Sequence, residues 1–303
     1  MDIESTIKQP QEFKVKQILK SLLKVLITVF CFWYIQRKID FARVGSMVHF
    51  MNYPWMLLAL ASFVVSKIVS SYRLNLYFKA MGIRMTQTSN LRLYWLGMFY
   101  NLFLPGSISG DAYKVIRLTK VYKKPAKQVT AAVVFDRFSG LLNLGLLLVI
   151  FWILVQGFTA LGALFIASAL LAVLVCYLVC RRFFPYLLLA FWRTFALGMI
   201  VQVLQVACMF AILQALYIET HSAQYLLVFL VSCVVAVLPF TIGGLGAREM
   251  VFLWGASLFL LDAEQSVLGS IAFYAVTVTA SLPGLVFVFF DPLPANAETI
   301  ANK

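Results

Sequence analysis

Two short segments of this 303-residue chain interrupt long apolar stretches with Pro, Gly and ionisable side chains. They are Leu102–Lys114 (Leu-Phe-Leu-Pro-Gly-Ser-Ile-Ser-Gly-Asp-Ala-Tyr-Lys) and Leu238–Glu249 (Leu-Pro-Phe-Thr-Ile-Gly-Gly-Leu-Gly-Ala-Arg-Glu). Aligned on Leu-Pro, both read Leu-Pro-x-x-Ile-(Ser/Gly)-Gly, and a carboxylate follows, Asp111 or Glu249. The segments lie nearly half the chain apart. Paired Gly/Pro interruptions of this kind predict an internal repeat and a transporter site built from two broken or re-entrant helices.

Backbone chemistry explains why such breaks are useful. Pro105 and Pro239 lack an N–H, and glycine permits positive φ, so a helix can stop and restart there. The freed backbone groups are tolerable only against protein or water. A restarting helix presents N–H groups that attract an anion such as phosphate. The alternative is a pair of proline kinks whose free backbone groups bond to neighbouring Ser and Thr.

Ionisable side chains beside the breaks are candidate ligands, because charge inside a membrane is costly and is retained chiefly for function. We expect Arg248 and the helix N-termini to hold a phosphate. An acidic side chain would pair with a cationic headgroup or carry a coupling proton; the candidates are Asp111, Asp136 and Glu249. The predicted substrate-binding residues are Asn101, Pro105, Gly110, Asp111, Lys114, Arg117, Asp136, Arg137, Pro239, Gly243, Gly244, Gly246, Arg248 and Glu249.

Several of these residues also have purely structural interpretations. Asp111 precedes a Tyr-Lys-Val-Ile run and is a good helix N-cap. The Asp136-Arg137 pair is compatible with a solvated helix end. Asn101 is compatible with a hydrogen bond to a neighbouring helix. The sequence leaves these alternatives open.

The elements that must position these residues are membrane helices. The chain is 62% hydrophobic and 12% charged, with mean hydropathy +0.91, whereas soluble domains carry about 25% charged residues. We predict an all-α, polytopic membrane helix bundle; a β-barrel would show alternating segments of about 10 residues instead. The net charge of +13 fits basic cytoplasmic loops and anionic lipid headgroups. We therefore expect no nucleic acid partner.

About eight apolar segments are expected. They span residues 21–35, 54–71, 131–156, 161–180, 196–218, 225–238, 250–261 and 267–290. The predicted organisation is a cytoplasmic segment 1–20, one transmembrane domain 21–290 and a cytoplasmic tail 291–303. The start of the chain is similar to a signal peptide. Because its apolar run ends in Cys-Phe-Trp-Tyr rather than in small residues, we expect an uncleaved first span.

Charge in the loops predicts the orientation. Basic groups in residues 8–20, 114–127 and 181–193 fall on one side when the N-terminus is placed inside. The acidic loops around Glu219 and Asp262 then fall outside, and the C-terminus is cytoplasmic. Only the basic residues of 37–43 disagree. Residues 114–127 also alternate basic and apolar side chains, which predicts a basic amphipathic segment in the interface, either gathering headgroups or anchoring the topology.

Chemistry that needs a cofactor is not indicated. The five cysteines lie in apolar runs, and His49 and His221 are too few and too far apart for a metal site. No phosphate-cradling Gly-x-x-x-x-Gly-Lys loop is present. We expect no cofactor, no metal and no soluble catalytic domain.

The chain resembles the lysylphosphatidylglycerol synthase transmembrane-region family, flippase-like membrane proteins of bacteria and archaea. The resemblance rests on residues 101–117, on Phe135-Asp-Arg137 and on residues 238–249, and it covers about residues 15–290. The first family motif usually reads Asn-x-x-x-Pro-x-x-x-Gly-Gly followed by a basic residue. Here Ser109 replaces the first Gly, and Lys114 or Arg117 supplies the basic residue.

The resemblance implies a multi-pass lipid flippase of the cytoplasmic membrane. Its partners would be membrane lipids: an anionic or aminoacylated phospholipid, or a lipid-linked glycan. Two-part family members also carry a soluble synthase domain; we expect none here, so the resemblance does not imply synthesis. One alternative is a non-catalytic membrane subunit or scaffold for a separate envelope lipid or glycan synthase. Another is a membrane-embedded transferase, which the scarcity of paired acids disfavours. The sequence does not predict the oligomeric state.

Overall fold

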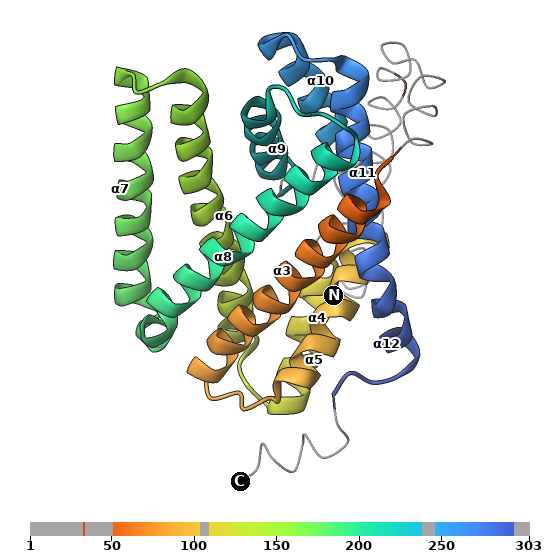
Figure 1. Cartoon of the computed structure of the whole chain (residues 1–303). Coiled ribbons are helices and arrows are strands. Elements are labelled where there is room, and N and C mark those ends of the chain that lie inside the picture. Colours follow the sequence, from red (N-terminus) through yellow and green to blue (C-terminus); the bar gives the residue numbers. More distant parts are fainter. Residues whose placement is uncertain (1–32, 34–50, 104–108, 238–245, 294–303) are drawn as a thin grey trace, which may run out of the picture.

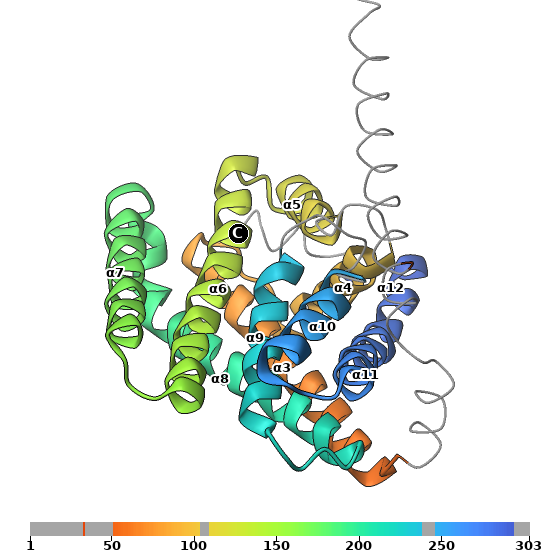
Figure 2. The ribbon, with the colours of Figure 1, turned by 90° about the horizontal axis from the view of Figure 1, so that it is seen from above.

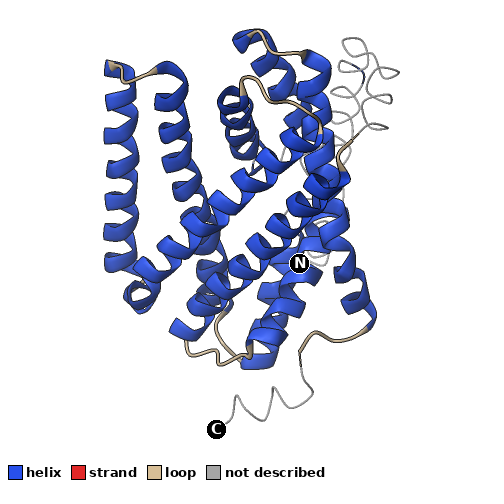
Figure 3. Cartoon of the chain, in the orientation of Figure 1, coloured by secondary structure: helices blue, strands red, loops and turns tan. Residues whose placement is uncertain are grey.

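The computed structural model describes residues 51–103, 109–237 and 246–293, together with Trp33. These residues fold into helices and short connections, and none of them forms a strand (Figure 3). The helices are α3 (Tyr53–Ala80), α4 (Gln87–Phe103), α5 (Ser109–Tyr122), α6 (Ala126–Gln156), α7 (Ala160–Phe183), α8 (Pro185–Ala215), α9 (Ser222–Val237), α10 (Ala247–Phe259), α11 (Ala263–Ser281), η1 (Leu282–Leu285) and α12 (Val286–Phe289). The all-α membrane bundle is confirmed.

Five of the described helical segments are long and apolar enough to cross a membrane: α3, α6, α7, α8 and the continuous segment α11–η1–α12. The prediction of about eight crossing segments is not supported. Two of the apolar runs became α9 and α10, with 16 and 13 residues, fewer than the roughly 20 that a crossing needs. The first run, residues 21–35, lies outside the described residues except for Trp33.

The described helices follow one length pattern twice. In each half a long helix is followed by two short ones and another long one: α3, α4, α5, α6 and then α8, α9, α10, α11. The two short helices of each half pack against one another. Packing between the halves also corresponds, because α4 packs on α11 and α9 packs on α6. Figure 2 shows α7 at one edge of the bundle.

Charged loops gather at two opposite ends of the bundle (Figure 1). The end reached by α3, α5 and α7 is basic, with Arg84, Lys123 and Arg182 among its exposed residues. The opposite end, where α8 and α10 finish, carries Glu219 and Asp262. Helix starts at both ends follow known capping chemistry: Pro185 occupies the first turn of α8, and the Asp262 carboxylate accepts from the Gln265 N–H at 2.9 Å.

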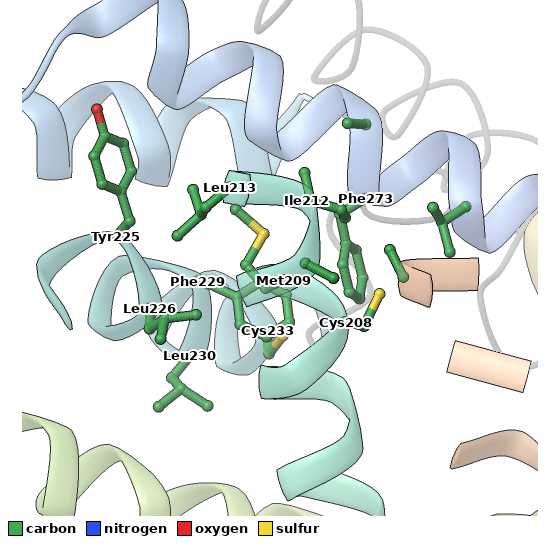
Figure 4. Close-up of a cluster of buried hydrophobic side chains, with 14 of the residues drawn as sticks. Cys208, Met209, Ile212, Leu213, Tyr225, Leu226, Phe229, Leu230, Cys233 and Phe273 are labelled. Atoms are coloured by element: carbon green, nitrogen blue, oxygen red, sulfur yellow. The ribbon is translucent and has the colours of Figure 1, made fainter. Parts of the chain in front are cut away.

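The largest apolar core lies between α8, α9 and α11, with a contribution from α3 (Figure 4). Phe229 and Phe273 pack with ring centroids 4.7 Å apart, and Phe63 of α3 meets Phe273 edge-on at 5.6 Å. Helices α3 and α8 run side by side and make the most extensive helix contact of the described chain (Figure 1). In this part of the bundle α9 packs on α6 and α8, and α10 packs on α9 and α11.

Candidate functional site

A cavity of about 300 Å³ lies inside the bundle, where the inner ends of all four short helices approach α3, α6 and α8. Its seven charged side chains come from four helices: Lys67 and Arg73 (α3), Asp111 and Lys114 (α5), Asp136 and Arg137 (α6) and Arg248 (α10). Asn101 and Tyr94 from α4 and Gln202 and Gln205 from α8 also line it. Buried ionisable groups among membrane helices are expensive and mark functional sites.

A buried ion pair joins α3 to α6. The Arg73 Nε donates to the Asp136 Oδ1 at 2.7 Å, and the Arg73 Nη2 donates to the backbone carbonyl of Asp136 at 3.1 Å. Both side chains are almost fully buried. Gly198 of α8 makes room for this guanidinium, because a Cβ there would approach Nη1 to 3.1 Å. The Nη1 atom has no hydrogen-bond partner among the described residues, so this cation keeps a free donor.

A second charge cluster joins α5 to α6. Asp111 accepts from the Lys114 Nζ at 3.1 Å on one oxygen and from the Arg137 Nε on the other. Lys114 also lies over the Tyr94 ring, 4.5 Å from its centroid, an arrangement that favours a cation. Lys114 is therefore buried in the bundle. The predicted amphipathic segment required it to face the membrane interface, and for this residue that prediction is wrong. Helix α5 begins at Ser109, so Asp111 lies inside its first turn and not at the N-cap position, and its carboxylate pairs with Lys114 and Arg137.

Close packing of α4 on α5 holds this cluster in place. A Cβ added at Gly110 would overlap the Gly97 backbone, and one added at Gly97 would overlap the Lys114 side chain. The Asn101 Oδ1 accepts the Gly110 N–H at 2.8 Å. Asn101 therefore satisfies an N–H at the start of α5, where the helix itself supplies no acceptor.

Two further cations of the cavity lack an acidic partner among the described residues. The Lys67 Nζ lies 4.4 Å from the Phe63 ring centroid, and the Arg248 guanidinium lies 4.7 Å from that of Phe273. The buried Nε of Arg248 donates to no described atom. Aromatic faces stabilise such cations only modestly, which leaves both able to bind an anion.

Glu249 lies next to Arg248 in sequence but does not line the cavity. Its carboxylate accepts from the Gly246 N–H at 2.7 Å and from the Ser270 hydroxyl at 2.9 Å. Gly246 has φ of 80°, a conformation that favours glycine. These contacts lie at the start of α10 and fasten it to α11.

The structure brings six of the predicted site residues together around the cavity: Asn101, Asp111, Lys114, Asp136, Arg137 and Arg248. Gly110, Gly246 and Glu249 support the helices that carry them. Arg117 lies elsewhere and pairs with Asp291. Pro105, Pro239, Gly243 and Gly244 lie outside the described residues.

The sequence interpretation missed Lys67 and Arg73. Lys67 is the only charged residue in the apolar run 54–71. A single charge in such a run indicates a functional residue and could have identified it. Arg73 lies beyond the predicted end of that run at residue 71, whereas α3 continues to Ala80.

Comparison with known proteins gives one family. A family model described as "Lysylphosphatidylglycerol synthase TM region" matches residues 21–284. No curated protein matches the chain. The matched range includes every helix that lines the cavity.

Proposed function

Because the chain belongs to the lysylphosphatidylglycerol synthase transmembrane-region family, we propose that it is a flippase, which moves a lipid with a charged headgroup across the cytoplasmic membrane. The observation that carries the proposal is the cavity, where seven ionisable side chains from both halves of the bundle converge between membrane helices. A headgroup needs such a polar path because it cannot cross hydrocarbon alone. The acyl chains would remain in the surrounding lipid.

The short helices support a transporter architecture. With 17 and 14 residues, α4 and α5 form a pair that we propose enters from the basic end and returns to it. With 16 and 13 residues, α9 and α10 form the corresponding pair from the acidic end. The two halves then constitute an inverted repeat with the substrate site at their junction, as in secondary transporters.

In this mechanism the headgroup binds between the inner ends of the two re-entrant pairs. Arg248 and Lys67 contact the phosphate, while the paired clusters around Asp111 and Asp136 hold α5, α6 and α3 in position. Rocking of one half against the other along α3 and α8 exposes the site alternately to the two membrane surfaces. The basic end would face the cytoplasm, with the N- and C-termini on that side.

Reconstitution tests this proposal. Purified protein in phospholipid vesicles should move a fluorescent phospholipid between leaflets, as measured by the fraction open to a membrane-impermeant quencher. The Arg248→Ala variant should lose most of the rate above protein-free vesicles, because it removes a cation of the cavity. Arg193→Ala removes an exposed cation of α8 that does not line the cavity, and should transport normally.

Absence of lipid movement by the well-folded wild-type protein would contradict the proposal. Movement that appears only after a synthase is added would favour the scaffold alternative. Equal rates for the wild type and Arg248→Ala would remove this cavity from the mechanism.

A further inference from the structure

The cavity carries an excess of positive charge. Of the residues that the structure describes, five basic and two acidic side chains line it, a formal excess of three positive charges. An environment of low dielectric strengthens the effect of such an imbalance on any bound charge.

The carboxylates near the cavity are already engaged. Both oxygens of Asp111 accept from cations, Lys114 and Arg137. The Asp136 Oδ1 accepts from the Arg73 Nε, and Glu249 is held by the Gly246 N–H and the Ser270 hydroxyl. An entering ammonium group would therefore have to displace Lys114 or Arg137 from Asp111, or share Asp136 with the Arg73 guanidinium that already neutralises it.

The unpartnered donors, in contrast, are cationic. Lys67 and Arg248 line the same cavity without an acidic partner among the described residues, and the Nη1 of the buried Arg73 is also free there. A guanidinium and an ammonium together suit a phosphate, which accepts several charge-assisted hydrogen bonds. Lys67 and Arg73 lie on α3 in the first half of the bundle, and Arg248 lies on α10 in the second half.

We propose that the cavity selects a lipid whose phosphate headgroup carries net negative charge and rejects the same lipid once amino groups make its headgroup cationic. This inference rests on the proposed function and specifies its substrate class. Addition of a lysyl group to phosphatidylglycerol changes the headgroup charge from −1 to +1. The added ammonium groups would then lie among five cations with no free carboxylate in the described site.

Two measurements on the full-length protein test the selectivity. In detergent, thermal stabilisation is measured with phosphatidylglycerol, phosphatidylcholine, lysylphosphatidylglycerol and inorganic phosphate. In vesicles, movement of trace fluorescent analogues of the three lipids is measured with an impermeant quencher. We expect phosphatidylglycerol to bind and move at least about tenfold better than its lysyl derivative, a ratio that one unfavourable charge contact readily produces.

Matched variants connect the selectivity to the two free cations. Lys67→Gln and Arg248→Gln should each reduce the preference for phosphatidylglycerol several-fold. Lys79→Gln, on the same helix as Lys67 but exposed, and Arg193→Gln should keep the wild-type preference. If Lys67→Gln fails to fold, Arg248→Gln alone decides the comparison.

The outcomes separate this inference from the proposed function. Movement of lysylphosphatidylglycerol as fast as phosphatidylglycerol would overturn the inference and leave the flippase standing. Selective binding that depends on Arg248, without movement of any lipid, would support the inference and overturn the flippase. If inorganic phosphate stabilises the protein at the same concentration as phosphatidylglycerol, the site takes a free anion and the lipid assignment is wrong.

Discussion

At the scale of single residues, the Arg73–Asp136 pair is a buried ion pair in the wall of the cavity. It joins α3 to α6 through one side-chain and one backbone contact. Because both side chains are nearly fully buried, removal of one leaves the other as an uncompensated charge. Such losses cost about 3–5 kcal/mol in proteins. The pair also leaves the Arg73 Nη1 without a partner among the described residues, so this atom can donate to a substrate.

We expect Asp136→Asn to destabilise the folded protein by about 3–5 kcal/mol for this reason. Arg73→Lys should also be less stable than the wild type, although it keeps the positive charge, because an ammonium cannot reproduce the two-point geometry of the guanidinium. The measurement is thermal denaturation in detergent, with the loss of the monodisperse elution peak as the readout. Arg193→Gln serves as the control for a lost surface charge. Wild-type stability of Asp136→Asn would show that the pair is not a structural requirement.

The residues of the site were partly predictable from sequence. Asp111, Asp136, Arg137 and Arg248 drew attention because ionisable groups are rare in apolar stretches. Which of them pair with one another was not predictable, since the partners lie on different helices and their contacts depend on the packing of α5 on α6. The roles of Lys67 and Arg73 were not predictable either, because they depend on how α3 packs against the inner ends of the short helices.

At the scale of elements, glycines decide how closely α4 approaches α5. A Cβ at Gly110 would overlap the Gly97 backbone, and backbone cannot move aside as a flexible side chain can. This approach also places the Asn101 side chain on the Gly110 N–H. The position of Asp111 and Lys114 in the cavity therefore depends on the absence of a side chain at Gly110.

Gly110→Ala should destabilise the protein by about 1–3 kcal/mol, as overpacking does, and should slow lipid movement by displacing α5. Gly145→Ala is the matched helix-interior control, because a Cβ there meets no described atom within 4 Å. That variant should be neutral or stabilising by about 0.5–1 kcal/mol through helix propensity. Thermal denaturation and the vesicle assay give both readouts. Equal behaviour of the two alanine variants would contradict the close-packing account.

Glu249→Gln should weaken the attachment of α10 to α11. The carboxylate accepts from the Gly246 N–H and the Ser270 hydroxyl, and an amide has one acceptor oxygen in place of two. The expected loss is about 1–3 kcal/mol of stability, measured by thermal denaturation. Headgroup preference should be unchanged, since Glu249 does not line the cavity. Glu219→Gln, exposed at the acidic end, is the control. A changed headgroup preference would instead place Glu249 in the substrate site.

The lengths of α9 and α10 show what sequence could tell about elements. Their apolar composition suggested crossing segments, although residues 225–238 and 250–261 are too short to cross at about 20 residues per span. That length was readable in the sequence. Their packing against each other and against α6 and α11 was not, because it rests on contacts between distant parts of the chain.

At the scale of the whole molecule, we propose that the helix pairs α4–α5 and α9–α10 are re-entrant and enter from opposite sides. Single cysteines are introduced into a cysteine-free background and labelled from one side with an impermeant maleimide. Those at Arg84, Lys123 and Arg182 should react from the basic side, because these residues are exposed there, two on loops and Arg182 in the last turn of α7. Those at His221 and Leu260 should react only from the other side.

The same experiment distinguishes re-entrant helices from crossing ones. A cysteine at Val237, at the inner end of α9, lines the cavity and should resist a bulky polyethylene-glycol maleimide from both sides. Rapid reaction with that reagent from the basic side would mean that α9 crosses the membrane completely.

The central claim is that a lipid headgroup passes through this cavity, and reversible obstruction tests it most directly. In the cysteine-free background, Gln205→Cys places one thiol on the cavity wall. Arg193→Cys places one outside it as the control. Modification by a bulky methanethiosulfonate should stop lipid movement only in Gln205→Cys, and reduction should restore it in the same sample, which excludes misfolding. Unchanged lipid movement with the Gln205→Cys thiol fully modified would contradict the account.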